Sequence, residues 1–273
     1  TVEAETSTGA FWATRTILQA LKGNDNVSIP KGITRDYPLY KVRGFILDVG
    51  RKTFTLDYLQ QVVKEMSWYK MNDFQIHLND NLIVLERLGS VEEIMAAYSG
   101  FRLESDIKEG GNNGLNKADL TSKDVYYTKD DFRDFIKKSR VYGVDIVPEF
   151  DTPAHSLALT KVRPDLRHGT SGRDNDHLNL TTKYDESLEF VQSIFDEYMG
   201  ESLENPVFDL ETTVHIGADE YTANANAYRQ FCNDMLSYVK DSGRNARVWG
   251  SLTRIKGNIE VPGEGVQMNI WNN

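Results

Sequence analysis

The chain has 273 residues, 40% hydrophobic and 11% aromatic, so it can bury a large core. Its formal net charge of −10 argues against a nucleic-acid partner, which needs clustered lysine and arginine, and favours a neutral substrate. A single cysteine, Cys232, excludes an intrachain disulfide and a cysteine-based zinc site. No apolar run reaches the roughly 18 residues of a membrane span, and no leader pattern follows Thr1.

The first 40 residues differ in pattern from the rest of the chain. Residues 9–22 have the apolar spacing of an amphipathic helix, and a proline-containing link follows them. Neither segment fits the repeat that begins near residue 43. We therefore expect residues 1–40 to be the tail of a preceding domain with its link, and residues 41–273 to form a second domain.

Six short segments rich in β-formers then alternate with helical stripes. The strand candidates are residues 43–50, 73–80, 145–150, 212–220, 246–251 and 266–273. The first two stripes follow possible caps at Thr55 and Thr128, and the last two end at Gly200 and Gly243. Alternation of this kind, with strands interpreted as apolar on both faces, predicts a parallel sheet covered by helices.

Polar or aromatic residues follow nearly all of these strands, where a barrel would carry its active site. They are Arg51, Asp80, Asp151, Asp219, Glu220, Trp249 and Trp271. Because no glycine-rich phosphate loop follows the first strand, a closed barrel is favoured over an open nucleotide-binding sheet. We predict a (β/α)₈ TIM barrel that is truncated after about six of its eight βα units.

The segment VHIGADEY ends a strand candidate in two adjacent carboxylates, Asp219 and Glu220. Side chains alternate along a strand, so both can serve one site only if the strand ends there and the backbone turns. This pair favours acid–base chemistry. A metal site that combines Asp219 with histidines is a weaker alternative, because the sequence has no compact histidine pair. A glycosidase with Glu220 as acid is another, with Asp48, Asp80, Glu149 and Asp151 as nominal nucleophiles.

Four ordered motifs connect the chain to a known family. They are RGFILDVGRK at 43–52, HLND at 77–80, EFDTPAH at 149–155 and HIGADE at 215–220. In order and spacing they resemble the signature segments of family-20 glycoside hydrolases, the β-N-acetylhexosaminidases. The resemblance covers residues 9 to 273. It implies a (β/α)₈ barrel preceded by a small α/β domain, to which residues 1–40 would belong, a glycan substrate, and no metal or cofactor.

The resemblance also assigns roles to the paired carboxylates. In this family the nucleophile is the substrate's own acetamido oxygen. Asp219 would accept a hydrogen bond from the acetamido N–H, direct the carbonyl oxygen to C1 and stabilise the oxazolinium intermediate. Glu220 would protonate the leaving oxygen and later deprotonate water. The charge of Asp219 would help to keep Glu220 protonated, with a raised pKa.

Six further positions match the family's substrate site: Arg51, Asp80, Asp151, His155, Trp249 and Trp271. The resemblance implies that Arg51 binds ring hydroxyls, that Asp80 and His155 support the acid, and that the two tryptophans surround the sugar. Asp151 heads the segment that contains His155. Two departures alter the pattern. Ala154 replaces a glycine, and residues 81–84 replace a glutamine, glycine and tryptophan segment. The family's tyrosine and further groups from strands seven and eight would lie beyond Asn273.

The sequence thus predicts a retaining exo-glycosidase that releases β-linked N-acetylhexosamine from glycans. Two alternatives stay open: a lacto-N-biosidase that releases a galactosyl-GlcNAc disaccharide, and a non-catalytic glycan-binding barrel fragment. The glycan substrate suggests an extracellular or cell-surface location.

Overall fold

The computed structural model describes the chain except residues 24, 26–27, 108–119, 170–171 and 272–273. One parallel sheet has the strand order β1-β2-β5-β6-β7-β8, and a short antiparallel pair, β3-β4, lies beside it. The parallel strands are β1 (Gly44–Asp48), β2 (Asp73–His77), β5 (Asp145–Thr152), β6 (Thr213–Gly217), β7 (Asn245–Trp249) and β8 (Val266–Asn269), and the pair is β3 (Asn79–Asn81) with β4 (Ser99–Phe101). All six predicted strands are confirmed, and the end of the second segment forms β3.

The helices alternate with the strands as expected. They are α1 (Ser7–Lys22), α2 (Leu56–Trp68), α3 (Val91–Ala96), α4 (Lys129–Val141), α5 (Leu157–Val162), α6 (Tyr184–Met199) and α7 (Ala225–Asp241). Short 3₁₀ turns are η1 (Leu85–Arg87), η2 (Pro164–Leu166), η3 (Gly172–Asp176) and η4 (Gly250–Thr253). Thr55 and Thr128 cap α2 and α4 by accepting a backbone N–H, which confirms both predicted caps.

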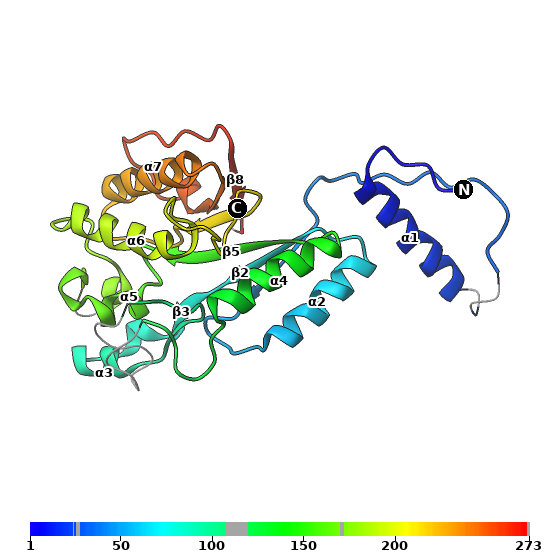
Figure 1. The fold of residues 1–273 in the computed structure, drawn as a ribbon. Coiled ribbons are helices and arrows are strands. Elements are labelled where there is room, and N and C mark those ends of the chain that lie inside the picture. The colour runs from blue at the N-terminus through cyan, green and yellow to red at the C-terminus, as the bar shows by residue number, and fades with distance from the viewer. Residues whose placement is uncertain (24, 26–27, 108–119, 170–171, 272–273) are drawn as a thin grey trace.

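The hydrophobic core lies between the outer face of the sheet and its helices. Phe74 of β2, Phe150 of β5 and Ile216 of β6 are buried there. Helix α4 packs on β5, and α7 packs on β6 and β7. In Figure 1, α1 lies at one end of this layered body, where Gln19 donates to the carbonyl of Trp68 at 2.5 Å, and none of the residues of α1 is buried. The core therefore fixes the strands whose C-terminal ends carry the site residues.

The inner face of the sheet is mostly polar, so the interpretation of the strands as apolar on both faces was wrong. Its side chains include Asp73, Gln75, His77, Glu149, His215 and Arg247, all buried or nearly so. Most of these groups pair with one another: His77 and Gln75 contact Glu149, and Arg247 pairs with Asp73, which makes a polar interior tolerable. Most apolar residues of the strands point outward to the helices, whereas Ile46 and Val147 pair in register with Gln75 and share the inner face.

Contacts across the inner face show that the sheet is strongly curled. Asp73 and Arg247 form a two-bond ion pair with distances of 2.8 and 2.5 Å. Their strands are three places apart, about 14 Å in a flat sheet at the usual spacing, which is beyond the reach of a direct side-chain pair. Asn269 likewise donates to Gln75, four strands away. The described strands thus form a partial barrel.

The two outer strands of this partial barrel each have one unpaired edge among the described residues, because β1 pairs only with β2 and β8 only with β7. Phe45 and Ile46 of β1 and Met268 of β8 are exposed. Within the described ranges, no helix is both long and apolar enough to cross a membrane.

Candidate active site

The predicted site residues lie at or just after the C-terminal ends of the strands, and three of the eight line a cavity of about 510 Å³. Arg51, His155 and Glu220 line it, together with Ser251 and the loop that follows β3. These groups come from the ends of different strands, so the curl of the sheet brings together residues that are far apart in sequence. Glu220 stands at the cavity wall.

The backbone after β6 turns sharply, as two adjacent catalytic carboxylates would require. Gly217, Ala218 and Glu220 have φ angles of 73°, 65° and 47°, in the left-handed region that only glycine adopts without cost. The N–H of Ala218 donates to the carbonyl of Thr152 at 2.8 Å, which holds the turn against β5. Strain of this kind persists only where the surroundings enforce it, and it is typical of functional sites.

Asp219 is fixed through one of its two carboxylate oxygens. Its Oδ1 accepts hydrogen bonds from the hydroxyl of Ser251, from the indole N–H of Trp271 at 3.1 Å and from the N–H of Glu220 at 3.1 Å. Its own N–H donates to Asp151 at 3.2 Å. Burial raises the pKa of Asp219, although the hydrogen bond from Ser251 opposes this rise. The other carboxylate oxygen of Asp219, Oδ2, accepts none of these hydrogen bonds from the described residues.

His155 lies beneath Glu220 and links it to Asp80. The Nε2 of His155 is 3.6 Å from Glu220, and its Nδ1 is 3.1 Å from Asp80. Asp80 also contacts the guanidinium of Arg51 at 2.7 Å, and Arg51 pairs with Asp48 at 2.9 Å. The arginine is therefore held at the cavity wall by two carboxylates.

The charges of these groups follow from burial and from their partners. Burial by itself would lower the pKa of His155, but the carboxylates of Asp80 and Asp151 raise it well above its ordinary value. For Asp80, burial is outweighed by His155 and His77, and the pKa is lowered. Asp151 has its pKa raised well above the ordinary value, chiefly by burial. The site therefore places a cationic His155 between an ionised Asp80 and Glu220.

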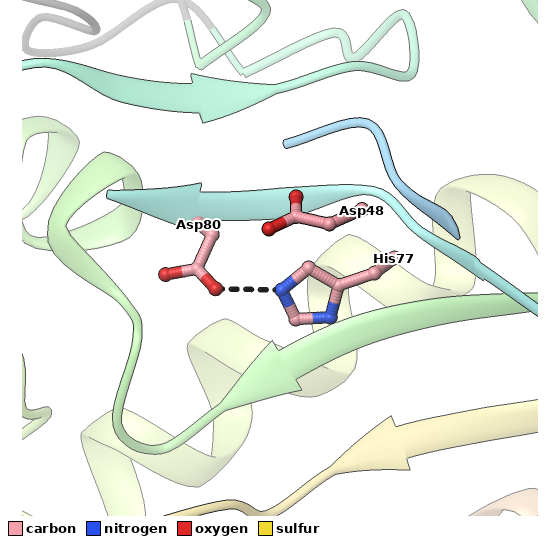
Figure 2. A group of neighbouring side chains, drawn as sticks. All are labelled: Asp48, His77 and Asp80. Atoms are coloured by element: carbon pink, nitrogen blue, oxygen red, sulfur yellow. Dashed lines mark hydrogen bonds and ion pairs between the residues drawn. The ribbon is translucent and has the colours of Figure 1, made fainter. Parts of the chain in front are cut away.

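Asp48, His77 and Asp80 also form a cluster whose ligand atoms lie close enough to hold a metal ion. Figure 2 shows His77 directed to Asp80, with Asp48 beside them. The guanidinium of Arg51 already pairs with both carboxylates, and both nitrogens of His77 face carboxylates. Because these cations already balance the carboxylates, the cluster is a poor cation site.

The comparison with protein families decides which family the chain represents. The catalytic domain of glycosyl hydrolase family 20 matches residues 40–240. The chain belongs to this family. Lacto-N-biosidase of Bifidobacterium bifidum is 25% identical over 267 residues, which cover 89% of this chain and 20% of the relative. Beta-N-acetylhexosaminidase of Cellulomonas fimi is 24% identical over 263 residues, which cover 92% and 48% of the two chains.

Solved structures agree at the level of the fold. The β-N-acetylhexosaminidase of Bacteroides fragilis superposes with a TM-score of 0.69 at 22% identity, over 97% of this chain and 52% of that one. The family-20 chain described here thus spans about half or less of the length of these relatives.

Two features of this family-20 site were not expected from the sequence. Neither Trp249 nor Trp271 is among the residues that line the described cavity, and the indole N–H of Trp249 points into the sheet interior, where it donates to Glu149. Ser251, which sequence reasoning missed, contacts both Asp219 and the N–H of Glu220. Its position just after the end of β7 was the available signal, but a single serine carries little information.

Proposed function

We propose that this chain hydrolyses β-linked N-acetylhexosamine glycosides with retention of configuration, by substrate-assisted catalysis. Glu220 protonates the glycosidic oxygen while the acetamido oxygen of the substrate attacks C1, and an oxazolinium forms. Water then opens this intermediate, and Glu220 takes its proton. Arg51 binds ring hydroxyls, and Trp271 borders the acetamido group.

The observation that carries this proposal is the way in which Asp219 is held. Three donors converge on Oδ1, from Ser251, Trp271 and the N–H of Glu220. Among the described residues they leave Oδ2 for a donor brought by the substrate. An acetamido N–H is such a donor, and a hydrogen bond to a fixed carboxylate would orient the acetamido carbonyl to C1.

A protein nucleophile fits the site less well. Asp48 and Asp80 are paired with Arg51, and Glu149 is fully buried under three hydrogen-bond donors. Asp151 has a raised pKa, chiefly because of burial, so it is a poor nucleophile. None of the nominal nucleophiles offers an exposed free carboxylate, which favours a nucleophile from the substrate.

Release of nitrophenol from nitrophenyl-β-GlcNAc, with the Glu220→Gln variant as control, tests this proposal. We expect Glu220→Gln to lower kcat by roughly 10²- to 10⁴-fold, the usual contribution of general acid–base catalysis. A thiazoline analogue of GlcNAc should inhibit the wild-type chain, because it resembles the oxazolinium. Activity that resists the thiazoline would contradict the role of Asp219.

A second candidate is release of a galactosyl-GlcNAc disaccharide. It is supported by the match of 89% of this chain to a protein named lacto-N-biosidase. Nitrophenyl-β-lacto-N-bioside separates the two activities, since an exo-hexosaminidase does not release the disaccharide from it. Binding of both glycosides without release of nitrophenol would instead favour a glycan-binding barrel fragment.

We also propose that two further βα units complete the barrel and that residues 1–40 belong to a small α/β domain. Exposed Phe45 and Met268 at the sheet edges and the absence of buried residues in α1 support this. A glycan substrate further suggests action outside the cell or at its surface.

A further inference from the structure

A continuous series of polar contacts runs from the interior of the sheet to Glu220. Glu149 Oε1 lies 2.9 Å from His77 Nδ1, and His77 Nε2 lies 2.7 Å from Asp80 Oδ2 (Figure 2). Asp80 Oδ1 lies 3.1 Å from His155 Nδ1, and His155 Nε2 lies 3.6 Å from Glu220. Carboxylates and imidazoles alternate along this series, which we call the buried relay.

The geometry of His77 determines its protonation state. Both of its ring nitrogens face carboxylate oxygens, one on Glu149 and one on Asp80. A neutral imidazole has one N–H and would turn a lone pair toward one of these oxygens, whereas an imidazolium donates to both. Burial would lower the pKa of His77, but Glu149 and Asp80 raise it well above its ordinary value. His77 is therefore a buried cation.

The surroundings of Glu149 hold its carboxylate in place and keep it ionised. It is fully buried, and it accepts hydrogen bonds from Gln75, from Trp249 and from His77. Burial would raise its pKa, but the charge of His77 leads the groups that lower it. A side chain that served only as a hydrogen-bond acceptor for these donors would not need a charge, which costs much more to bury.

We propose that Glu149 and His77 are positioning residues for proton transfer at Glu220. Glu149 keeps His77 doubly protonated, His77 fixes one oxygen of Asp80, and the other oxygen directs His155 to Glu220. This inference rests on the proposed function. When Glu220 gives its proton to the leaving oxygen, the new carboxylate forms 3.6 Å from a cation held in place by the buried relay.

Other charged groups around His77 do not replace Glu149. Among the described residues, the titratable groups near His77 are Asp48 of β1, Asp80 of β3, Glu149 and Asp151 of β5, and His215 of β6, and Arg51 pairs with the first two. Asp48 is paired with Arg51, and Asp151 has a raised pKa, chiefly because of burial. Burial lowers the pKa of His215 to about 4, and its Nδ1 accepts a backbone N–H, so it is neutral at pH 7.

The test compares the wild-type chain with Glu149→Gln and, as matched control, Gln75→Met. The control removes the hydrogen bond from Gln75 to the same carboxylate, and the one that Gln75 accepts from Asn269, but leaves the charge of Glu149. The kcat and KM are measured against pH, with whichever nitrophenyl glycoside the wild-type chain cleaves. We expect Glu149→Gln to lower kcat by roughly tenfold, with little change in KM because the amide oxygen still accepts from Trp249.

The shape of the pH profile separates a positioning role from a structural one. Without the charge of Glu149, His77 loses its second proton at lower pH, so the alkaline limb of kcat should move to lower pH. Gln75→Met should retain the wild-type limb. The inference is overturned if the alkaline limb of kcat does not move in Glu149→Gln, or if it moves by the same amount in Gln75→Met.

A second measurement needs no variant and does not depend on activity. Nitrogen-15 NMR of the histidine side chains in the wild-type chain should show His77 and His155 doubly protonated at pH 7, with His215 singly protonated. A singly protonated His77 at pH 7 overturns the inference whatever the activity. A wild-type chain that cleaves neither glycoside, with His77 doubly protonated, counts against the proposed function alone.

Discussion

Ser251 is the residue that holds the two adjacent acids in one arrangement. Its hydroxyl donates to Asp219 Oδ1 and accepts from the N–H of Glu220 at 3.3 Å. The first hydrogen bond stabilises the ionised form of Asp219 and so opposes the rise that burial gives to its pKa. The serine therefore helps Asp219 to stay ionised and able to accept the acetamido N–H.

Ser251→Ala should reduce activity at low pH and so narrow the pH range in which the chain is active. Loss of the hydroxyl donor raises the pKa of Asp219 further, so Asp219 is protonated at higher pH. The acid limb of kcat/KM should move to higher pH, with a loss of roughly tenfold at its acid end. The matched control is Thr253→Ala in the same turn, whose hydroxyl donates to Gly250. Equal acid limbs in the two variants would contradict this role.

At this scale the sequence predicted part of the site. The motifs around Asp80, His155 and Asp219 identified residues that the structure places together. The roles of Ser251 and Glu149 could not be predicted, because each depends on a contact between different strands that motif spacing does not encode. The orientation of Trp249 depends on Glu149 for the same reason.

At the scale of elements, β6 ends in a turn that only a close approach of two strands explains. An added Cβ on Gly217 would lie 2.3 Å from Asp151, and the φ of Gly217 is 73°. The pairing of β5 with β6 is irregular between Glu149 and Thr152, next to this turn. The irregularity lets the backbone of β6 pass against Asp151 and turn Asp219 toward the site.

Gly217→Ala should therefore damage both folding and activity. The methyl group would push Asp151 away from the N–H of Asp219, and the left-handed φ would add strain. We expect a loss of about 2 kcal/mol in the free energy of unfolding, with a fall in kcat. Gly263→Ala is the control, because an added Cβ there meets nothing within 4 Å. A wild-type kcat in Gly217→Ala would mean that the turn tolerates displacement of Asp151.

The positions of the elements were predictable where periodicity and caps agree, as for α2 behind Thr55 and α4 behind Thr128. The split of the segment 73–80 into β2 and the antiparallel β3 was not, because it depends on pairing with β4, which is distant in sequence. That split is what turns Asp80 toward His155.

At the scale of the whole molecule, the polar inner face could not be inferred from strand composition. A strand with alternating polar and apolar residues can turn its polar side chains to water, or it can bury them where they hydrogen-bond to one another. Only the curl of the sheet brings Gln75 within reach of Asn269, and Asp73 within reach of Arg247. A polar interior of this kind allows the buried relay to run from Glu149 to the cavity.

Asp73→Asn tests whether the ion pair between Asp73 and Arg247 holds the curl. Arg247 is 4% exposed and would lose its charged partner inside the sheet. We expect a loss of roughly 3 kcal/mol in the free energy of unfolding, measured with urea, because an unpaired buried charge is costly. Asp134→Asn is the matched control, since Asp134 pairs with Lys138 at 3.8 Å on an exposed helix surface, and it should cost at most about 0.5 kcal/mol.

A double variant separates the charge from the packing. Asp73→Leu with Arg247→Met removes both charges, so its stability should lie closer to wild type than that of Asp73→Asn. If Asp73→Asn lowers the free energy of unfolding no more than Asp134→Asn does, the ion pair between Asp73 and Arg247 does not hold β2 against β7. The curl would then have to be set by the helices that cover the outer face of the sheet, because they are the other elements that constrain the same strands.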